Sequence, residues 1–168
     1  MPPDEVIERL GLKPGMVIAG TGFFALPFAR AVGRAGAVWA IDLQPEMLRM
    51  LEEKLRREGD SENIRLIEGD AGHTGIPDRA CDVAFLANLW HELDDSPAVL
   101  AETRRILRPR GRLAILDWRS HAPCPPGLPV EHRIAADRTK AALTDDGWRN
   151  LNLGLLGPYS YLLIASPE

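Results

Sequence analysis

The stretch MVIAGTGFFALPFARAVG, residues 16–33, joins a short apolar run to an amphipathic run through two glycines. The apolar start predicts a buried strand over Met16–Ala19, and the spacing that follows predicts a helix over Phe24–Val32. Between them, Gly20 and Gly22 would let the backbone approach a ligand, and the helix start would offer free N–H groups. Tight packing of the turn explains two glycines equally well, so this stretch alone leaves both interpretations open.

The same alternation of short apolar runs and helical spacing continues along the chain. Further strands are predicted over Val38–Leu43, Ile64–Glu68, Val83–Leu89 and Leu113–Trp118, and further helices over Pro45–Glu58, Ala98–Leu107 and Glu131–Leu143. Two apolar runs around Gly157–Pro158 predict a closing hairpin. The expected fold is α/β, a Rossmann-like doubly wound sheet of about seven strands, mostly parallel with an antiparallel last strand.

Composition narrows the classes of function. A chain of 168 residues, 45% hydrophobic and 26% charged, fits a single domain over residues 1–168. A net charge of -4 provides no broad basic surface for nucleic acid, so a small molecule is the expected partner. The sequence has no signal-peptide pattern and no long apolar stretch, which predicts a cytoplasmic protein without membrane contact. Cys81 and Cys124 are expected to be free thiols.

Carboxylates follow two of the predicted strands. Asp42 ends the run AVWAID about 20 residues beyond the glycine turn, where a carboxylate can accept hydrogen bonds from both ribose hydroxyls. Capping of the helix that begins near Pro45 is the alternative. The next strand ends in EGDA, which brings Asp70 and Ala71 to the same edge, within reach of an adenine amino group.

Six segments together resemble a known family. They are LKPG, GTGFFALPFARAVG, VWAIDLQPEML, IRLIEGDA, CDVAFLANLWHEL and ETRRILRPRGRLAILDW. In this order the chain resembles class I S-adenosylmethionine-dependent methyltransferases, particularly the UbiE-like or methyltransferase type 11 group, over nearly its whole length. The resemblance implies S-adenosylmethionine as cofactor and methyl transfer to a small or medium-sized acceptor.

The resemblance also implies a set of cofactor-binding residues at the strand ends: Ala19, Gly20, Gly22, Asp42, Leu43, Asp70, Ala71, Asn88 and Leu89. The first three would line the methionine part, the next two would hold the ribose and adenine, and Asp70 and Ala71 would border the adenine. The last two would lie below the methionyl group. Trp90 and His91 would then face the acceptor.

His91 is the candidate catalytic residue. Transfer from a sulfonium mainly requires an acceptor lone pair held in line with the methyl carbon, but a hydroxyl or acidic carbon must also lose a proton. His91 could take that proton, or it could only cap or pack the following helix. The acceptor pocket is expected from the N-terminal helix, the LWHEL segment, the loop Arg119–Val130, and Tyr159 with Tyr161, either open or completed by a second subunit in a homo-oligomer.

The first predicted strand departs from the family's usual pattern. Met16 and Ile18 stand where the family usually has an acidic residue and a further glycine, so the first strand looks short and a contact to the cofactor's amino group is missing. That loss corresponds to roughly tenfold to hundredfold in affinity. A non-catalytic binding module is therefore the alternative, whereas a nicotinamide dehydrogenase is disfavoured because the chain has no Tyr-x-x-x-Lys pair. No metal site is expected, since His121, Cys124, Glu131 and His132 match no ligand spacing.

Overall fold

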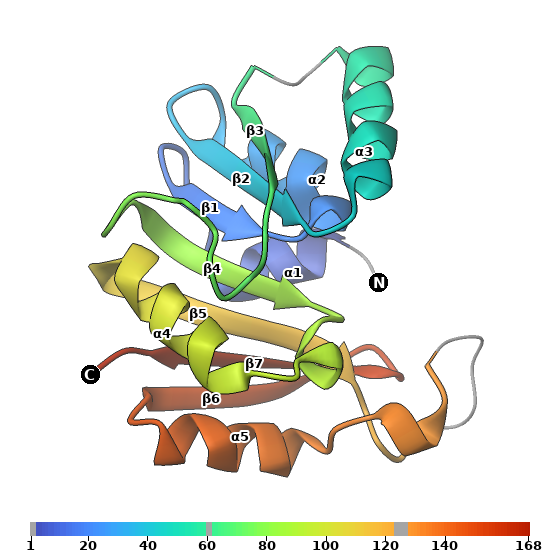
Figure 1. Cartoon of the computed structure of the whole chain (residues 1–168), viewed down its shortest axis with the longest axis vertical. Coiled ribbons are helices and arrows are strands. Elements are labelled where there is room, and N and C mark those ends of the chain that lie inside the picture. Colours follow the sequence, from blue (N-terminus) through green and yellow to red (C-terminus); the bar gives the residue numbers. More distant parts are fainter. Residues whose placement is uncertain (1–2, 60–61, 123–127) are drawn as a thin grey trace.

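The strands assemble into one seven-stranded sheet in the order β3-β2-β1-β4-β5-β7-β6 (Figure 1). The computed structural model describes residues 3–59, 62–122 and 128–168. The strands are β1 (Val17–Gly20), β2 (Ala37–Asp42), β3 (Ile64–Glu68), β4 (Cys81–Ala87), β5 (Leu107–Trp118), β6 (Arg149–Leu156) and β7 (Ser160–Ser166). The pairs among β1 to β5 are parallel, and β7 runs antiparallel to both of its neighbours. The predicted α/β class and mostly parallel sheet are confirmed.

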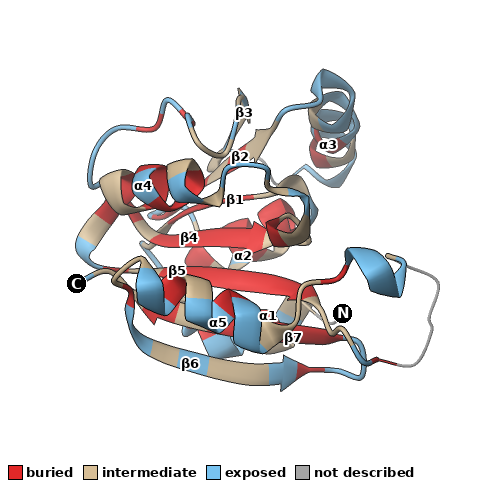
Figure 2. Ribbon diagram, turned by 60° about the horizontal axis from the view of Figure 1, so that its bottom comes forward, coloured by how far each residue is buried: buried red, intermediate tan, exposed pale blue. Residues whose placement is uncertain are grey.

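Helices cover both faces of this sheet. They are α1 (Pro3–Leu10), α2 (Ala25–Val32), α3 (Pro45–Glu58), α4 (Ser96–Ile106) and α5 (Ala136–Asp145), with single 3-10 turns η1 (Gly22–Phe24), η2 (Trp90–Glu92) and η3 (Val130–His132). Side chains alternate along β4, so Phe85 packs with α1, α2 and α3, whereas Ala84 packs with α4 and α5. Figure 2 shows the central strands buried along their length between these layers.

The central strand β1 is short, as the sequence indicates, with four residues. It nevertheless pairs with β2 on one side and β4 on the other. The first N–H of β1, on Val17, donates to Oδ2 of Asp82 at 2.8 Å. The same oxygen accepts a hydrogen bond of 2.6 Å from Arg108. A side chain of β4 therefore supplies the partner at the start of β1.

The predicted start of β5 is wrong. The strand begins at Leu107 and not at Leu113, so Pro109 and Gly111 lie within it. The pairing of β4 with β5 shifts register between Cys81 and Val83, and this bulge accommodates a proline that has no N–H to donate. The helix before it, α4, starts two positions earlier than Ala98, because the Asp95 side chain caps it by accepting from the Ala98 N–H at 3.0 Å.

The predicted helix Glu131–Leu143 is also displaced. The chain forms the turn η3 first and starts α5 only at Ala136. Between them, Arg133 is buried and donates to the backbone carbonyls of Leu128 and Arg119, which holds the segment out of helical geometry. The helix Pro45–Glu58 and the closing hairpin lie where the sequence predicts them.

The helices of the described residues include none long and apolar enough to cross a membrane. Cys81 is free and buried at the start of β4. Burial raises the pKa of its thiol to about 12, which keeps it protonated and unreactive near neutral pH. The prediction of a free thiol at Cys124 falls outside the described residues.

Candidate active site

The carboxyl ends of four neighbouring strands meet at one edge of the sheet (Figure 1). The parallel register sets Gly20 of β1 opposite Phe85 of β4, and Asp42 of β2 opposite Glu68 of β3. Beyond the strands the backbone pairing continues, with the Gly69 N–H donating to the Asp42 carbonyl at 3.1 Å. The segments singled out in the sequence therefore lie side by side, as parallel strands require.

The glycines of the first turn have a packing role. A Cβ on Gly20 would lie 2.8 Å from the Phe85 carbonyl oxygen, and one on Gly22 would lie 3.2 Å from Cδ2 of Leu51. The first distance is shorter than any ordinary contact, so β1 and β4 can approach this closely only without a side chain at Gly20. Ala19, just before it, is buried on the face covered by α4 and α5.

Asp42 occupies the turn between β2 and α3. Its Oδ1 accepts a 2.9 Å hydrogen bond from the backbone N–H of Gln44, the residue that precedes the helix. The carboxylate therefore fixes this turn and does not cap the first turn of α3. Among the described residues nothing bonds Oδ2, which leaves that oxygen for a ligand. Leu43 beside it is 63% exposed.

Asp70 and Ala71 follow β3 in a tight turn. Oδ1 of Asp70 accepts from the Gly72 N–H at 2.5 Å, and its carbonyl accepts from the His73 N–H at 2.9 Å. The Asp70 side chain is thus partly used to hold its own turn. Ala71 is half-buried and packs with the residues under α4 and α5.

Asn88 follows β4 in a left-handed backbone conformation, which asparagine adopts more readily than most residues other than glycine. Its φ is +51°, in the left-handed region, and its N–H donates to the Leu116 carbonyl at 2.8 Å. Its side-chain Oδ1 is buried and has no partner within the described residues. A buried amide oxygen without a donor fits the approach of a ligand N–H group. Leu89, the next residue, is half-buried at the start of η2.

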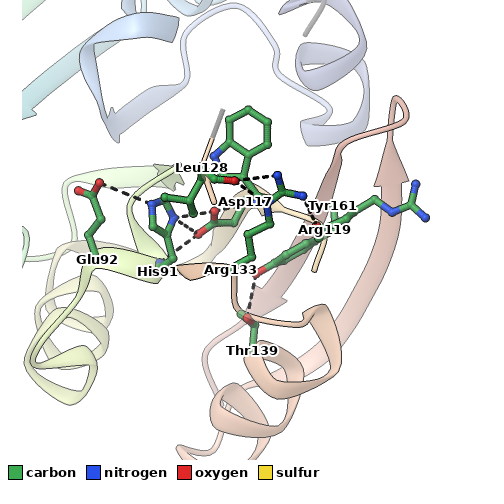
Figure 3. Close-up of polar contacts among 9 residues, drawn as sticks. His91, Glu92, Asp117, Arg119, Leu128, Arg133, Thr139 and Tyr161 are labelled. Atoms are coloured by element: carbon green, nitrogen blue, oxygen red, sulfur yellow. Dashed lines mark hydrogen bonds and ion pairs between the residues drawn. The ribbon is translucent and has the colours of Figure 1, made fainter. Parts of the chain in front are cut away.

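His91 lies in η2 and bonds a buried aspartate of the adjacent strand (Figure 3). Its Nδ1 is 2.8 Å from Oδ1 and 3.0 Å from Oδ2 of Asp117, and its backbone N–H donates to Oδ2 at 3.1 Å. On the other side of the ring, Nε2 is 3.5 Å from Oε1 of Glu92. His91 does not cap α4, because Asp95 performs that role.

Asp117 is the functional candidate that the sequence interpretation missed. It stands next to last in β5, after an apolar run, and is 1% exposed. Burial raises the pKa of its carboxyl group from the ordinary value, against the opposing effect of the Trp118 N–H and of His91. The signal was available in LAILDW, since an aspartate in an apolar strand is rarely buried without a partner.

The tyrosines separate into two environments. Tyr161 is fully buried, and its hydroxyl lies 2.8 Å from Oγ1 of Thr139 on α5, so the expectation that it lines an acceptor pocket is wrong. Burial also raises the pKa of Tyr161, which keeps it neutral. Tyr159 is exposed in the turn between β6 and β7 and stays a candidate for that pocket.

The other three histidines, His73, His121 and His132, are exposed. The nearest polar partner of the His121 ring is Oγ of Ser120, at 2.7 Å from Nδ1. Within the described ranges no group of three or more His, Cys, Asp or Glu side chains is arranged to hold a metal ion. The set of possible metal ligands that the sequence analysis disfavours, His121, Cys124, Glu131 and His132, includes Cys124, which lies outside those ranges.

Two surface hollows lie away from the strand ends. One of about 520 Å³ lies between α1 and α2, and the other, of about 330 Å³, lies between α1 and the β6–β7 pair. Neither is lined by a residue of the predicted cofactor set. The sheet topology, and not cavity volume, therefore identifies the candidate site.

Residues 16–115 match the family described as "Methyltransferase domain". The chain belongs to this family. The ubiquinone/menaquinone biosynthesis C-methyltransferase UbiE of Shewanella halifaxensis is 32% identical over 116 residues, 67% of this chain and 46% of that protein. The demethylmenaquinone methyltransferase of Lactobacillus johnsonii is 28% identical over 184 aligned positions, 88% of this chain and 75% of that protein. The resemblance found in the sequence is confirmed.

A solved structure of a methyltransferase matches the fold of this chain over nearly its whole length. The crystal structure of a SAM-dependent methyltransferase from Aquifex aeolicus superposes on this methyltransferase domain with a TM-score of 0.90 and 30% identity. The match covers 97% of this chain and 88% of that chain. The chain spans about half the length of the UbiE relatives that it matches.

Proposed function

We propose that this chain is an S-adenosylmethionine-dependent methyltransferase that acts on a small or medium-sized acceptor. The observation that supports it most is the position of Asp42. This carboxylate ends β2 beside the end of β1 and keeps Oδ2 available for a ligand. In the methyltransferase fold, a carboxylate there can hold the hydroxyls of a ribose.

The residues at the strand ends have suitable chemistry for the cofactor. The backbone of Ala19 and Gly20, with the turn at Gly22, offers polar groups to the methionine part. The unpartnered Oδ1 of Asn88 is an acceptor for an amino group. Asn88 directly follows β4, the strand next to β1, and β1 lacks the acidic residue expected in this family. Leu43, Asp70, Ala71 and Leu89 complete the proposed set around the adenine and the sulfur.

When bound, S-adenosylmethionine supplies a methyl group on a sulfonium, whose C–S bond breaks as the acceptor's lone pair forms a new bond to carbon. The tasks of the protein are to align the acceptor, exclude water and receive a proton if the acceptor carries one. His91 is the proposed proton acceptor, because it lies just beyond the end of β4 and its Nε2 is directed toward the exposed carboxylate of Glu92.

The test of cofactor binding is Asp42→Asn. The amide oxygen keeps the hydrogen bond to Gln44, so the turn is retained, but the charge that would hold the ribose is lost. We expect the affinity for S-adenosylhomocysteine, measured by isothermal titration calorimetry, to fall at least about tenfold. Asp137→Asn, on the exposed side of α5, is the matched control and should leave the affinity unchanged. Equal affinities in both variants would reject the ribose assignment.

A coupled assay for homocysteine release over a panel of acceptors separates transfer from binding. Release that depends on an acceptor supports the proposed enzyme. Tight binding of S-adenosylhomocysteine without release over the panel would favour the alternative, a non-catalytic cofactor-binding module. No binding at all would reject both.

A further inference from the structure

Asp117 is buried near the end of β5 and bonds Nδ1 of the His91 ring. Its carboxylate receives N–H groups on both oxygens: Trp118 donates to Oδ1 at 2.7 Å and the backbone of His91 donates to Oδ2 at 3.1 Å. These two contacts come from fixed backbone, so the carboxylate cannot turn away from the ring. Figure 3 shows Asp117 and His91 facing each other from neighbouring strand ends.

The surrounding hydrogen bonds determine which nitrogen of His91 carries hydrogen. An ionised carboxylate only accepts, and both oxygens of Asp117 already accept from backbone N–H groups, so Nδ1 must be the donor across the 2.8 Å contact. In the neutral ring, Nε2 then holds the lone pair. The His91 side chain is only 4% exposed and bonded at Nδ1, which prevents the ring from exchanging its two nitrogens.

The outer side of the ring is the route for a proton. The polar neighbour of Nε2 is Oε1 of Glu92 at 3.5 Å, a distance too long for a strong hydrogen bond. The Glu92 side chain is 65% exposed and can move aside for an incoming molecule. Nε2 is therefore the ring nitrogen that Asp117 leaves available for a ligand at the strand ends.

We propose that Asp117 is a positioning residue that holds His91 in the Nδ1–H tautomer and presents the Nε2 lone pair to the acceptor. The inference rests on the proposed methyltransferase function. In this step X is the acceptor atom that receives the methyl group. Its X–H bond breaks and the proton moves to Nε2 of His91. The lone pair on X forms the bond to the methyl carbon, and the electron pair of the broken C–S bond stays on sulfur. Asp117 then balances the charge of the imidazolium until the proton leaves to water.

Within the described part of the chain, other charged and titratable side chains lie near the pair. Glu92 faces Nε2 from η2, and Tyr161 approaches Asp117 from β7 but is neutral and bonded to Thr139. Arg133 lies over the Trp118 ring and donates to backbone carbonyls of the segment before α5. Among the described residues, Glu92 is therefore the exposed carboxylate beside this pair.

The test is nitrogen-15 NMR of the histidine rings across a pH series, in the full chain with S-adenosylhomocysteine bound. In the wild-type protein at high pH we expect His91 to show a protonated Nδ1 and an unprotonated Nε2. The exposed rings of His73 and His132 should each show a mixture of tautomers and serve as internal controls. A hydrogen on Nε2 of His91 in the neutral wild-type ring would overturn the proposal. This measurement uses the wild-type protein, so it does not require that a variant fold.

The same NMR measurement on Asp117→Asn is the second test. Its amide matches the carboxylate in shape but can either donate or accept a hydrogen bond, so we expect the His91 signals to become a tautomer mixture. The affinity for S-adenosylhomocysteine should stay within about threefold of wild type. The matched control, Asp94→Asn at an exposed site, should change neither signal nor affinity. An unchanged His91 spectrum in Asp117→Asn would reject the positioning role, whereas loss of binding by the wild-type protein would reject the proposed function instead.

Discussion

Gly20 illustrates how one residue can serve packing and still leave a binding edge open. It ends β1, and its missing side chain lets the backbone of Phe85 on β4 come close. The sequence could not decide between packing and ligand approach, because both need a residue without Cβ. The structure supplies the packing reason directly, and the cofactor role of Gly20 stays a prediction.

Gly20→Ala should destabilise the protein. The new methyl group would lie 2.8 Å from the Phe85 carbonyl oxygen, and backbone on a central strand cannot move aside cheaply. We expect a loss of about 1–3 kcal/mol in the free energy of unfolding, measured by urea denaturation. The control is Gly69→Ala, where the nearest atom would be 3.6 Å away. Equal unfolding midpoints for the two variants would contradict the packing argument.

Between β3 and β4 the chain forms no helix in the described residues, and α4 holds this connection through an ion pair between buried Glu102 and partly exposed Arg105. Glu102 accepts from the N–H and the hydroxyl of Thr74, at 2.8 and 2.5 Å, and from Nε of Arg105 at 2.7 Å. Arg105 also donates to Asp78 and to the Ile76 carbonyl. Hydrogen bonding from Arg105, followed by that from Thr74, outweighs burial and lowers the pKa of Glu102 to about 2.

This pair predicts a definite dependence of stability on pH. Because the pKa of Glu102 is lower in the folded chain than its ordinary value of 4.5, its contribution is complete above about pH 4.5, decreases below that, and is lost as the pH falls through about 2. Glu102→Gln should therefore cost about 2 kcal/mol at pH 7 and clearly less at pH 2.5, by urea denaturation at each pH. Exposed Glu53→Gln is the control. A difference that does not change with pH would contradict the role of the charge.

Elements with strong local signals were predictable, and those set by distant contacts were not. The helix Pro45–Glu58 has a proline at its start and a glycine after its end, so local chemistry fixes both bounds. The start of β5 depends on a bulge opposite Cys81, and the start of α5 depends on buried Arg133, neither of which has a local pattern. In the site, Asp42 was proposed from its place at a strand end beyond the glycine turn, and His91 from its place after the next strand of the binding edge. The link from His91 to Asp117 joins two segments far apart in sequence, so no local pattern predicts it.

The sheet as a whole has a protected centre and two edges. β4, β5 and β7 lie inside it, whereas β6 and β3 each have one free side. In Figure 2 the edge strand β6 is largely exposed or half-buried, in contrast to β5. Because opening of an edge breaks fewer contacts than opening of the centre, stability should fall from the middle of the sheet outward.

Native-state hydrogen exchange can measure this gradient. We expect the amides of Phe85, Ile115 and Leu163 to exchange only through global unfolding, with the slowest rates in the chain. Amides of β6 such as Asn152 should exchange faster, through local opening. Mass spectrometry of peptides from each strand provides the measurement. Uniform protection across β5 and β6 would argue against the gradient.

The position of β7 between β5 and β6 has a consequence for synthesis on the ribosome. β5 ends at Trp118, but the strand that covers its outer side starts only at Ser160. A nascent chain therefore carries an open, apolar strand margin while the whole α5–β6 segment is being translated, and β6 cannot reach its place until β7 has emerged. During that interval the open edge of β5 is a site where the emerging polypeptide could pair with another chain.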